Sequence, residues 1–167
     1  MNPRYLDHLN RVVAVLAREH TIGELCAEVD AAARALAGHR LFTVLYVTPS
    51  GDEVARVYSN DPVSYPLAGR KRMGPTPWGD LVLRQGRHWI GRNDEDIRWA
   101  FPDHALIRSL GLGSALNVAI AYRGRVVGTM NLLDAPGAYS EDAIAPLLPL
   151  GALLAPALIE AARAGEG

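Results

Sequence analysis

The sequence of 167 residues contains only one cysteine, Cys26, so it has no internal disulfide and no set of thiolates that could hold a zinc ion. It also lacks an excess of charge of either sign: 17 lysines and arginines stand against 18 aspartates and glutamates, with a net charge of -1. A chain without a strong positive field is not expected to bind nucleic acid or an anionic membrane. Charges interrupt the N-terminus every few residues, which excludes a secretory signal and predicts a cytoplasmic, reducing environment.

Long apolar runs are absent as well. The least polar stretch, residues 143–159, contains Pro146, Pro149 and Pro156 and is shorter than a comfortable bilayer span. We therefore favour a buried or dimer-forming helix over a membrane segment. A composition of 49% hydrophobic and 21% charged residues is typical of a soluble globular protein, and the length predicts a single domain over residues 1–167.

Apolar spacings of three and four predict two N-terminal helices, over residues 5–16 and 22–36. Thr21 and Glu24 form a capping-box pattern at the start of the second helix, and Gly38 ends it. Strands are predicted over residues 41–47 and 53–59, and over 114–122 and 125–134, where Arg123-Gly124 is the clearest hairpin turn in the chain. Ser140, followed by two acidic residues, is expected to cap a last helix.

Short mixed elements separate the two hairpins, with helical patterns over residues 78–85, 94–101 and 105–110 and a short strand over 88–91. Residues 60–77 carry proline, glycine and charge without periodicity, which indicates a functional loop or a pocket lid, with disorder as the alternative. The order of these elements predicts an α+β fold, an antiparallel sheet with helices at the two chain ends.

Strand alternation assigns polar side chains to one face of this sheet. Asn117 lies on the face opposite Leu116, and Arg56 and Tyr58 share a face with each other because they are two residues apart. With a two-residue turn at Arg123-Gly124, Asn117 is expected opposite Met130, which places Asn131 on the Leu116 side. The aliphatic face would carry the helices, and the polar face would form the floor of a ligand pocket.

The segment SALNVAIAYRGRVVGTMNLLD, followed by a short loop and SEDAIAPLLPLGALLAPALI, resembles the C-terminal half of a GAF domain, most specifically in the hairpin with Gly124, Gly128 and Asn131. The resemblance extends over nearly the whole chain. It implies an antiparallel sheet with terminal helices on one face and a ligand-binding cap of short helices and loops on the other. The stretches LFTVLY, RVYS, YPLAGRK and FPDHALIRSLGLGSALNV resemble stand-alone bacterial GAF proteins, which implies that any output occurs in trans.

Departures from better characterised GAF branches narrow the expected chemistry. The run Asn93-Asp94-Glu95-Asp96 lacks the Lys and Phe that accompany such residues in cyclic-nucleotide-binding members. Free methionine-R-sulfoxide reductases and bilin-attaching members need pocket cysteines, whereas Cys26 falls on a predicted helix. No cofactor is expected on these grounds.

Several residues are candidates for a ligand-binding site. Arg56 and Tyr58 could clamp a carboxylate or phosphate, with an edge-strand ion pair as the alternative for the arginine. Lys71, between two arginines in the long loop, could close over an anion, although such a basic run also suits a solvated loop. Trp78 follows this loop and could form an aromatic wall, and Asn117 faces the same pocket.

His104 and Asp103 could supply acid and base groups, because an unperturbed histidine titrates near neutral pH. The alternative is a surface or capping role for both. His88 and His104 show no recognised metal-ligand spacing, so no metal site is expected.

Three functions remain open from the sequence. The leading hypothesis is a GAF domain that binds a small anionic or aromatic molecule through Arg56, Tyr58, Lys71, Trp78, His104 and Asn117 and acts as a sensory module in trans. The second is a small enzyme that acts on such a molecule, and the third is a protein-interaction module without a ligand. In each case a homodimer through the apolar terminal helices is expected.

Overall fold

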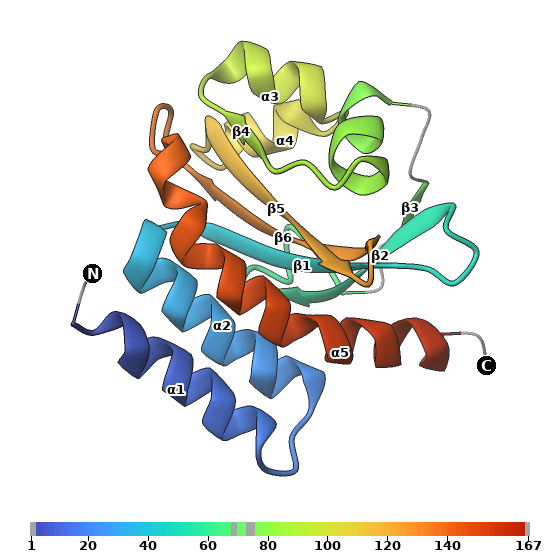
Figure 1. The fold of residues 1–167 in the computed structure, drawn as a ribbon. Helices are drawn as coiled ribbons and strands as arrows, with labels where there is room; N and C mark the ends of the chain where they lie inside the picture. Colours follow the sequence, from blue (N-terminus) through green and yellow to red (C-terminus); the bar gives the residue numbers. More distant parts are fainter. Residues whose placement is uncertain (1–2, 68–69, 73–75, 166–167) are drawn as a thin grey trace.

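The computed structural model of the protein describes residues 3–67, 70–72 and 76–165, without the side chains of residues 71 and 72. One antiparallel sheet organises the molecule, with strands in the order β3-β2-β1-β6-β5-β4 (Figure 1). The strands are β1 (Leu41–Val47), β2 (Glu53–Ser59), β3 (Arg70–Arg72), β4 (Trp89–Gly91), β5 (Ser114–Tyr122) and β6 (Arg125–Asp134). This sheet and its helices confirm the predicted α+β class.

Helices cover both faces of the sheet but differ in length. Three long helices lie on one side: α2 (Ile22–Ala37) and α5 (Leu148–Ala164) pack on the sheet, and α1 (Tyr5–Leu16) packs against these two helices on their outer side (Figure 1). The other face carries a cap made of the π-helical turn η1 (Gly79–Arg84) and the short helices α3 (Asp94–Ala100) and α4 (His104–Ser109). The architecture is therefore helices, sheet and cap, as the sequence predicted.

The main hydrophobic core lies between the sheet and the long helices. Strand residues of one parity, such as Phe42, Val44 and Leu116, pack there against buried residues of the helices, such as Val29 and Leu154. The capping box of α2 is present as predicted, because the Thr21 hydroxyl accepts from the N–H of Glu24 while the Glu24 carboxylate accepts from the N–H of Thr21.

The C-terminal segment differs from the expectation of one helix capped by Ser140. Two 3-10 turns, η2 (Glu141–Ala143) and η3 (Ala145–Leu147), precede α5, and the Ser140 side chain makes no capping hydrogen bond. By length and composition alone, Glu141–Ala164 is also the one described helical segment that could cross a membrane, a test that the core helix of a soluble protein also passes. Leu150, Leu154 and Leu158 of this segment are buried in the core.

Two β-bulges set the register of the described strands, and neither was predicted from the sequence. In the β1–β2 pair, Val44 lies opposite Tyr58 and Leu45 opposite Arg56, so Val57 is an extra residue. In the β5–β6 pair, Ile120 lies opposite Gly128 and Ala121 opposite Val126, so Val127 is an extra residue. Each bulge inverts the alternation of its strand, so the two residues that flank the extra residue point to opposite faces of the sheet.

Candidate functional site

A cavity of about 130 Å³ lies between the sheet and the cap. Strands β1, β2, β5 and β6 form its floor, while the loop after β2, the start of η1 and the segment from α3 to α4 form its walls. The lining residues are Leu41, Thr43, Leu45, Val54, Arg56, Tyr65, Thr76, Trp78, Leu83, Ala100, Phe101, Pro102, Asp103, Ile107, Asn117, Asn131 and Leu133. Most of these side chains are apolar, so the few polar groups decide which ligands the cavity can orient.

The floor carries a chain of hydrogen-bonded amides across three strands. Trp78 Nε1 donates to Asn117 Oδ1 at 3.0 Å, and Asn117 Nδ2 donates to Asn131 Oδ1 at 2.8 Å. Asn131 Nδ2 in turn donates to Thr43 Oγ1 at 3.2 Å. We call these four residues the amide relay. Because its members satisfy one another, the relay fixes the indole of Trp78 over the floor.

The bulge in the β5–β6 pair makes the amide relay possible. It places Asn117 directly opposite Asn131, whereas the expected register placed Asn117 opposite Met130 and Asn131 on the other face. That expectation was wrong because one extra residue on β6 shifts the pairing by one position. Asn131 and Thr43 therefore belong to the site, although neither was predicted from the sequence as a site residue.

Arg56 is the one cationic side chain among the described residues that line the cavity. Its Nη1 donates to the carbonyl oxygen of Pro66 at 2.8 Å, and its guanidinium carbon lies 5.1 Å from the ring centre of Tyr65. Its Nε atom is buried and has no hydrogen-bond partner among the described residues. Burial lowers the pKa of Arg56, while the nearby Tyr65 and Asp103 act in the opposite direction. The site therefore contains a desolvated N–H donor with capacity for an acceptor.

Aromatic side chains and one carboxylate complete the walls. The rings of Trp78 and Phe101 lie 5.6 Å apart, and the Tyr65 hydroxyl donates to Asp103 Oδ2 at 2.8 Å. Burial and the Asp103 carboxylate raise the pKa of Tyr65, which keeps its hydroxyl protonated as a donor. Tyr65 and Phe101 were not predicted, because the former lies in the aperiodic loop and the latter only marked a helix end.

Three of the predicted ligand-binding residues line the cavity, namely Arg56, Trp78 and Asn117. His104 begins α4 and is not a lining residue, whereas its neighbour Asp103 is. Lys71 lies in β3, where its backbone pairs with that of Val54 in β2, and its side chain lies outside the described residues. The described part of the long loop contributes Tyr65 and Thr76 to the walls.

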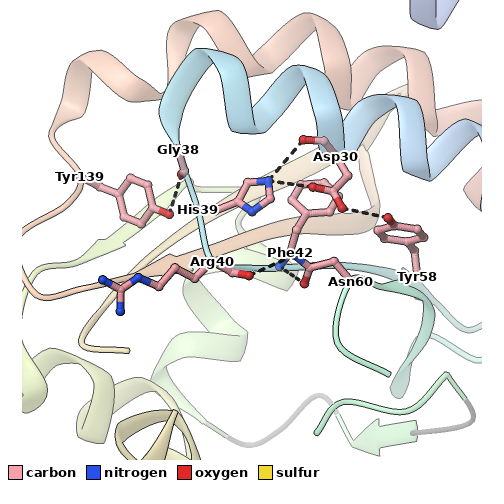
Figure 2. A network of polar contacts seen from close by, with 8 residues as sticks. All are labelled: Asp30, Gly38, His39, Arg40, Phe42, Tyr58, Asn60 and Tyr139. Carbon is pink, nitrogen blue, oxygen red and sulfur yellow. Dashed lines mark hydrogen bonds and ion pairs between the residues drawn. The ribbon is translucent and has the colours of Figure 1, made fainter. Parts of the chain in front are cut away.

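Tyr58 was placed on the wrong face. The bulge at Val57 turns it toward the long helices, where its hydroxyl donates to Asp30 Oδ2 of α2 at 2.8 Å (Figure 2). On the other side of Asp30, His39 Nε2 lies 2.9 Å from Asp30 Oδ1 (Figure 2). Burial raises the pKa of Tyr58, and the hydrogen bond to the Asp30 carboxylate is the next largest cause of this increase. Tyr58 thus joins β2 to α2 and does not face the cavity.

Thiol and metal chemistry have little support in the described residues. Cys26 is buried in α2, and burial raises the pKa of its thiol to about 12, so the reactive thiolate is scarce near neutral pH. Within residues 3–67, 70–72 and 76–165, no three His, Cys, Asp or Glu side chains are grouped so that they could hold a metal ion.

Comparison with known proteins points to one family. The family model described as GAF domain matches residues 19–158. The GAF domain of an Acinetobacter phosphoenolpyruvate-protein phosphotransferase has a similar fold, with 19% identity, a TM-score of 0.74 and coverage of 96% of each chain. The corresponding domain from Coxiella burnetii gives 16% identity and a TM-score of 0.72, covering 98% of this chain and 96% of that one.

A third structure is the free methionine-R-sulfoxide reductase from Neisseria meningitidis in complex with its substrate. It shares 20% identity with this chain at a TM-score of 0.69, covering 96% of this chain and 91% of its own. No curated protein matches the sequence significantly. At these identities the structural likeness shows the fold alone.

Proposed function

The chain belongs to the GAF domain family, whose members are small-molecule-binding sensory and regulatory modules, and we propose that it binds a small anionic or aromatic molecule in the cavity described above. The observation that carries this proposal is the buried Nε of Arg56, which has no hydrogen-bond partner among the described residues and belongs to a mostly apolar cavity. A carboxylate or phosphate oxygen there would accept the hydrogen bond that no described residue accepts. Lys71, whose backbone is in the strand next to β2, is proposed as a second cationic group.

The size and walls of the cavity support a ligand with one ring-sized apolar part. An apolar cavity of roughly 150 Å³ holds a benzene molecule in other proteins, and this cavity measures about 130 Å³. Trp78 and Phe101 offer ring faces for stacking. The side chains of the amide relay already form hydrogen bonds with one another, whereas Arg56 Nε has no partner among the described residues. Arg56 would therefore bind the polar group of the ligand and orient it.

Native mass spectrometry of freshly purified protein, before and after denaturation, is the first test. A retained small molecule that is lost on denaturation supports the proposal and gives its mass. Benzoate and benzyl alcohol serve as defined probes, because they share a ring and differ in charge. We expect benzoate to bind about tenfold more tightly than benzyl alcohol, as a charged hydrogen bond in a partly buried site predicts.

Variants locate this binding. Arg56→Gln should remove the preference for benzoate, whereas Arg108→Gln, on the exposed side of α4, should retain it. If neither probe bound and no molecule were retained, small-molecule binding in this cavity would be contradicted. Equal benzoate affinity in wild type and Arg56→Gln would contradict the role of Arg56 alone.

We further propose a cytoplasmic homodimer, acting in trans, that forms through the terminal helices. Leu6 and Val13 lie one above the other on α1 and are exposed, and Leu148 is exposed at the start of α5. The Tyr5 hydroxyl donates to the carbonyl oxygen of Pro146 at 3.2 Å, which holds the start of α1 beside the segment that enters α5. A self-complementary patch of this kind suits twofold symmetry. A monomer at micromolar concentration would contradict the dimer.

The enzymatic alternative has weaker support. Asp103 lines the cavity, but His104 does not, and the Asp103 carboxylate already accepts from Tyr65. The fold is shared with a sulfoxide reductase, yet Cys26 is buried in the helical layer. A binding role is therefore favoured over acid–base or thiol chemistry.

A further inference from the structure

A second concave surface lies at the other side of the sheet, away from the cavity. The turn between β1 and β2, the turn between β5 and β6, and the C-terminal half of α5 enclose a groove of about 530 Å³. Figure 1 shows α5 running past the end of β5 toward the C-terminus in this region. The groove and the cavity share none of the described residues that line them. We call this surface the basic groove.

Three arginines line the basic groove: Arg123, Arg125 and Arg163. Among the described residues, none that lines it is acidic, and none of the three arginines forms an ion pair with a carboxylate. Other surface arginines do so, as in the pair of Arg84 with Asp80 at 3.2 Å. In a chain with a net charge of -1, the basic groove is therefore a local positive surface.

Arg123 occupies a backbone conformation that disfavours its side chain. Its φ angle is 51°, and it is the one residue other than glycine with a positive φ among those described. Asn, Asp or Gly would suit this turn position better, since the left-handed region costs other residues about 1 kcal/mol. Because this arginine has an unfavourable backbone conformation and lies at the edge of a groove, its charged side chain is a candidate for a functional role.

The floor of the groove is apolar. Val47, Val126 and Ile159 are half-buried in it, and Leu158 is buried beneath them. An anion alone would leave this floor uncovered, and a bilayer surface would not enter a concave site between two turns. A nucleic acid backbone offers charge without an aliphatic side chain. The best match is an extended or helical peptide with acidic residues around one aliphatic anchor.

We propose that the basic groove docks an acidic segment of a partner protein that inserts an aliphatic side chain. The carboxylates of the segment would pair with the three arginines, and the anchor would cover Val126 and Ile159. This site is independent of small-molecule binding in the cavity. It supplies a route by which the domain can act on another protein.

The test uses a fluorescein-labelled peptide with one leucine flanked by glutamates, measured by fluorescence anisotropy. Two matched peptides replace leucine by serine or each glutamate by lysine. The combined variant Arg123→Asn, Arg125→Gln and Arg163→Gln should bind the acidic peptide about tenfold more weakly, and added salt should weaken wild-type binding. Asn is used at position 123 because it tolerates a positive φ. Arg108→Gln is the matched control and should bind like wild type.

Further outcomes separate the alternatives. The serine peptide should bind more weakly than the leucine peptide, and the double reversal Arg125→Glu with Arg163→Glu should prefer the lysine peptide. If the triple variant did not fold, Arg163→Gln on the exposed last turn of α5 would provide the same comparison. Equal binding of the acidic peptide by wild type and a folded variant would overturn the proposal. Preferential binding of phosphatidylserine vesicles or of a single-stranded oligonucleotide would also overturn it.

Discussion

Replacing Asn117 by alanine should destabilise the protein strongly, because this side chain is the centre of the amide relay. Asn117 is only 1% exposed, and it both accepts from Trp78 Nε1 and donates to Asn131 Oδ1. The substitution removes two hydrogen bonds, each worth about 1 kcal/mol, and leaves the buried oxygen of Asn131 without that donor, at a further cost of about 1 kcal/mol or more. We expect a loss of about 3 kcal/mol in the free energy of unfolding.

Urea denaturation followed by far-UV circular dichroism measures this loss, and thermal unfolding should show a decrease in Tm of about 10 °C for a domain of this size. Asn10→Ala, on the exposed surface of α1, is the matched control and should change the stability by less than about 0.5 kcal/mol. A double-mutant cycle with Trp78→Phe isolates the bond between the indole and the amide, with an expected coupling of about 1 kcal/mol.

The cycle also decides whether the relay exists in solution. Two results together would refute the reasoning: additive effects of Asn117→Ala and Trp78→Phe, and a loss of less than about 0.5 kcal/mol in the free energy of unfolding for Asn117→Ala. Removal of a buried, hydrogen-bonded amide should destabilise the protein by more than this.

Three further predictions test other parts of the structure. Tyr58→Phe should lower the free energy of unfolding by about 2 kcal/mol, because it removes a hydrogen bond to a buried carboxylate of α2, whereas Tyr122→Phe, at a half-exposed site, should have almost no effect in the same urea titration. Gly128→Ala should cost about 2 to 3 kcal/mol, since a Cβ atom there would collide with the backbone of β1 and with α5; Gly23→Ala, in an open position of α2, should not destabilise. His88 Nδ1 accepts from a backbone N–H of β5, and burial lowers its pKa below the usual 6.5, so the unfolded chain takes up the proton first as the pH falls. The free energy of unfolding of wild type should therefore fall relative to that of His88→Asn from about pH 6.5 downward. Urea denaturation of both proteins at about pH 7.5 and 5.5 measures this difference, and an equal change in the two proteins would show that His88 is not the cause.

Local patterns predicted most of the secondary structure. The spacing of apolar residues identified α1 and α2 at nearly their observed bounds, and Thr21 with Glu24 marked the start of α2. The tight turn at Arg123-Gly124 is present, with positive φ at both residues. These features depend on neighbours within about four residues in the chain, which is why the sequence reveals them.

Only part of the candidate site was predicted from the sequence, and the cause is the two β-bulges. Arg56 and Asn117 were assigned correctly to the cavity face, because the alternation up to each of them is unbroken. Tyr58 and Asn131 were assigned to the wrong faces, because a bulge lies between each of them and the residue from which the alternation was counted. Neither Val57 nor Val127 differs from an ordinary strand residue, so nothing local marks the extra position.

The sequence by itself determined the class of fold, the helical and strand segments, the hairpin turn and the near-neutral charge, since each follows from composition or from short-range spacing. The tertiary structure alone decided the register of the sheet, and with it the amide relay, the bond between Tyr58 and α2, and the walls that Tyr65 and Phe101 supply to the cavity. A bulge is selected by the packing of whole layers against each other, and one extra residue changes the face of every side chain beyond it.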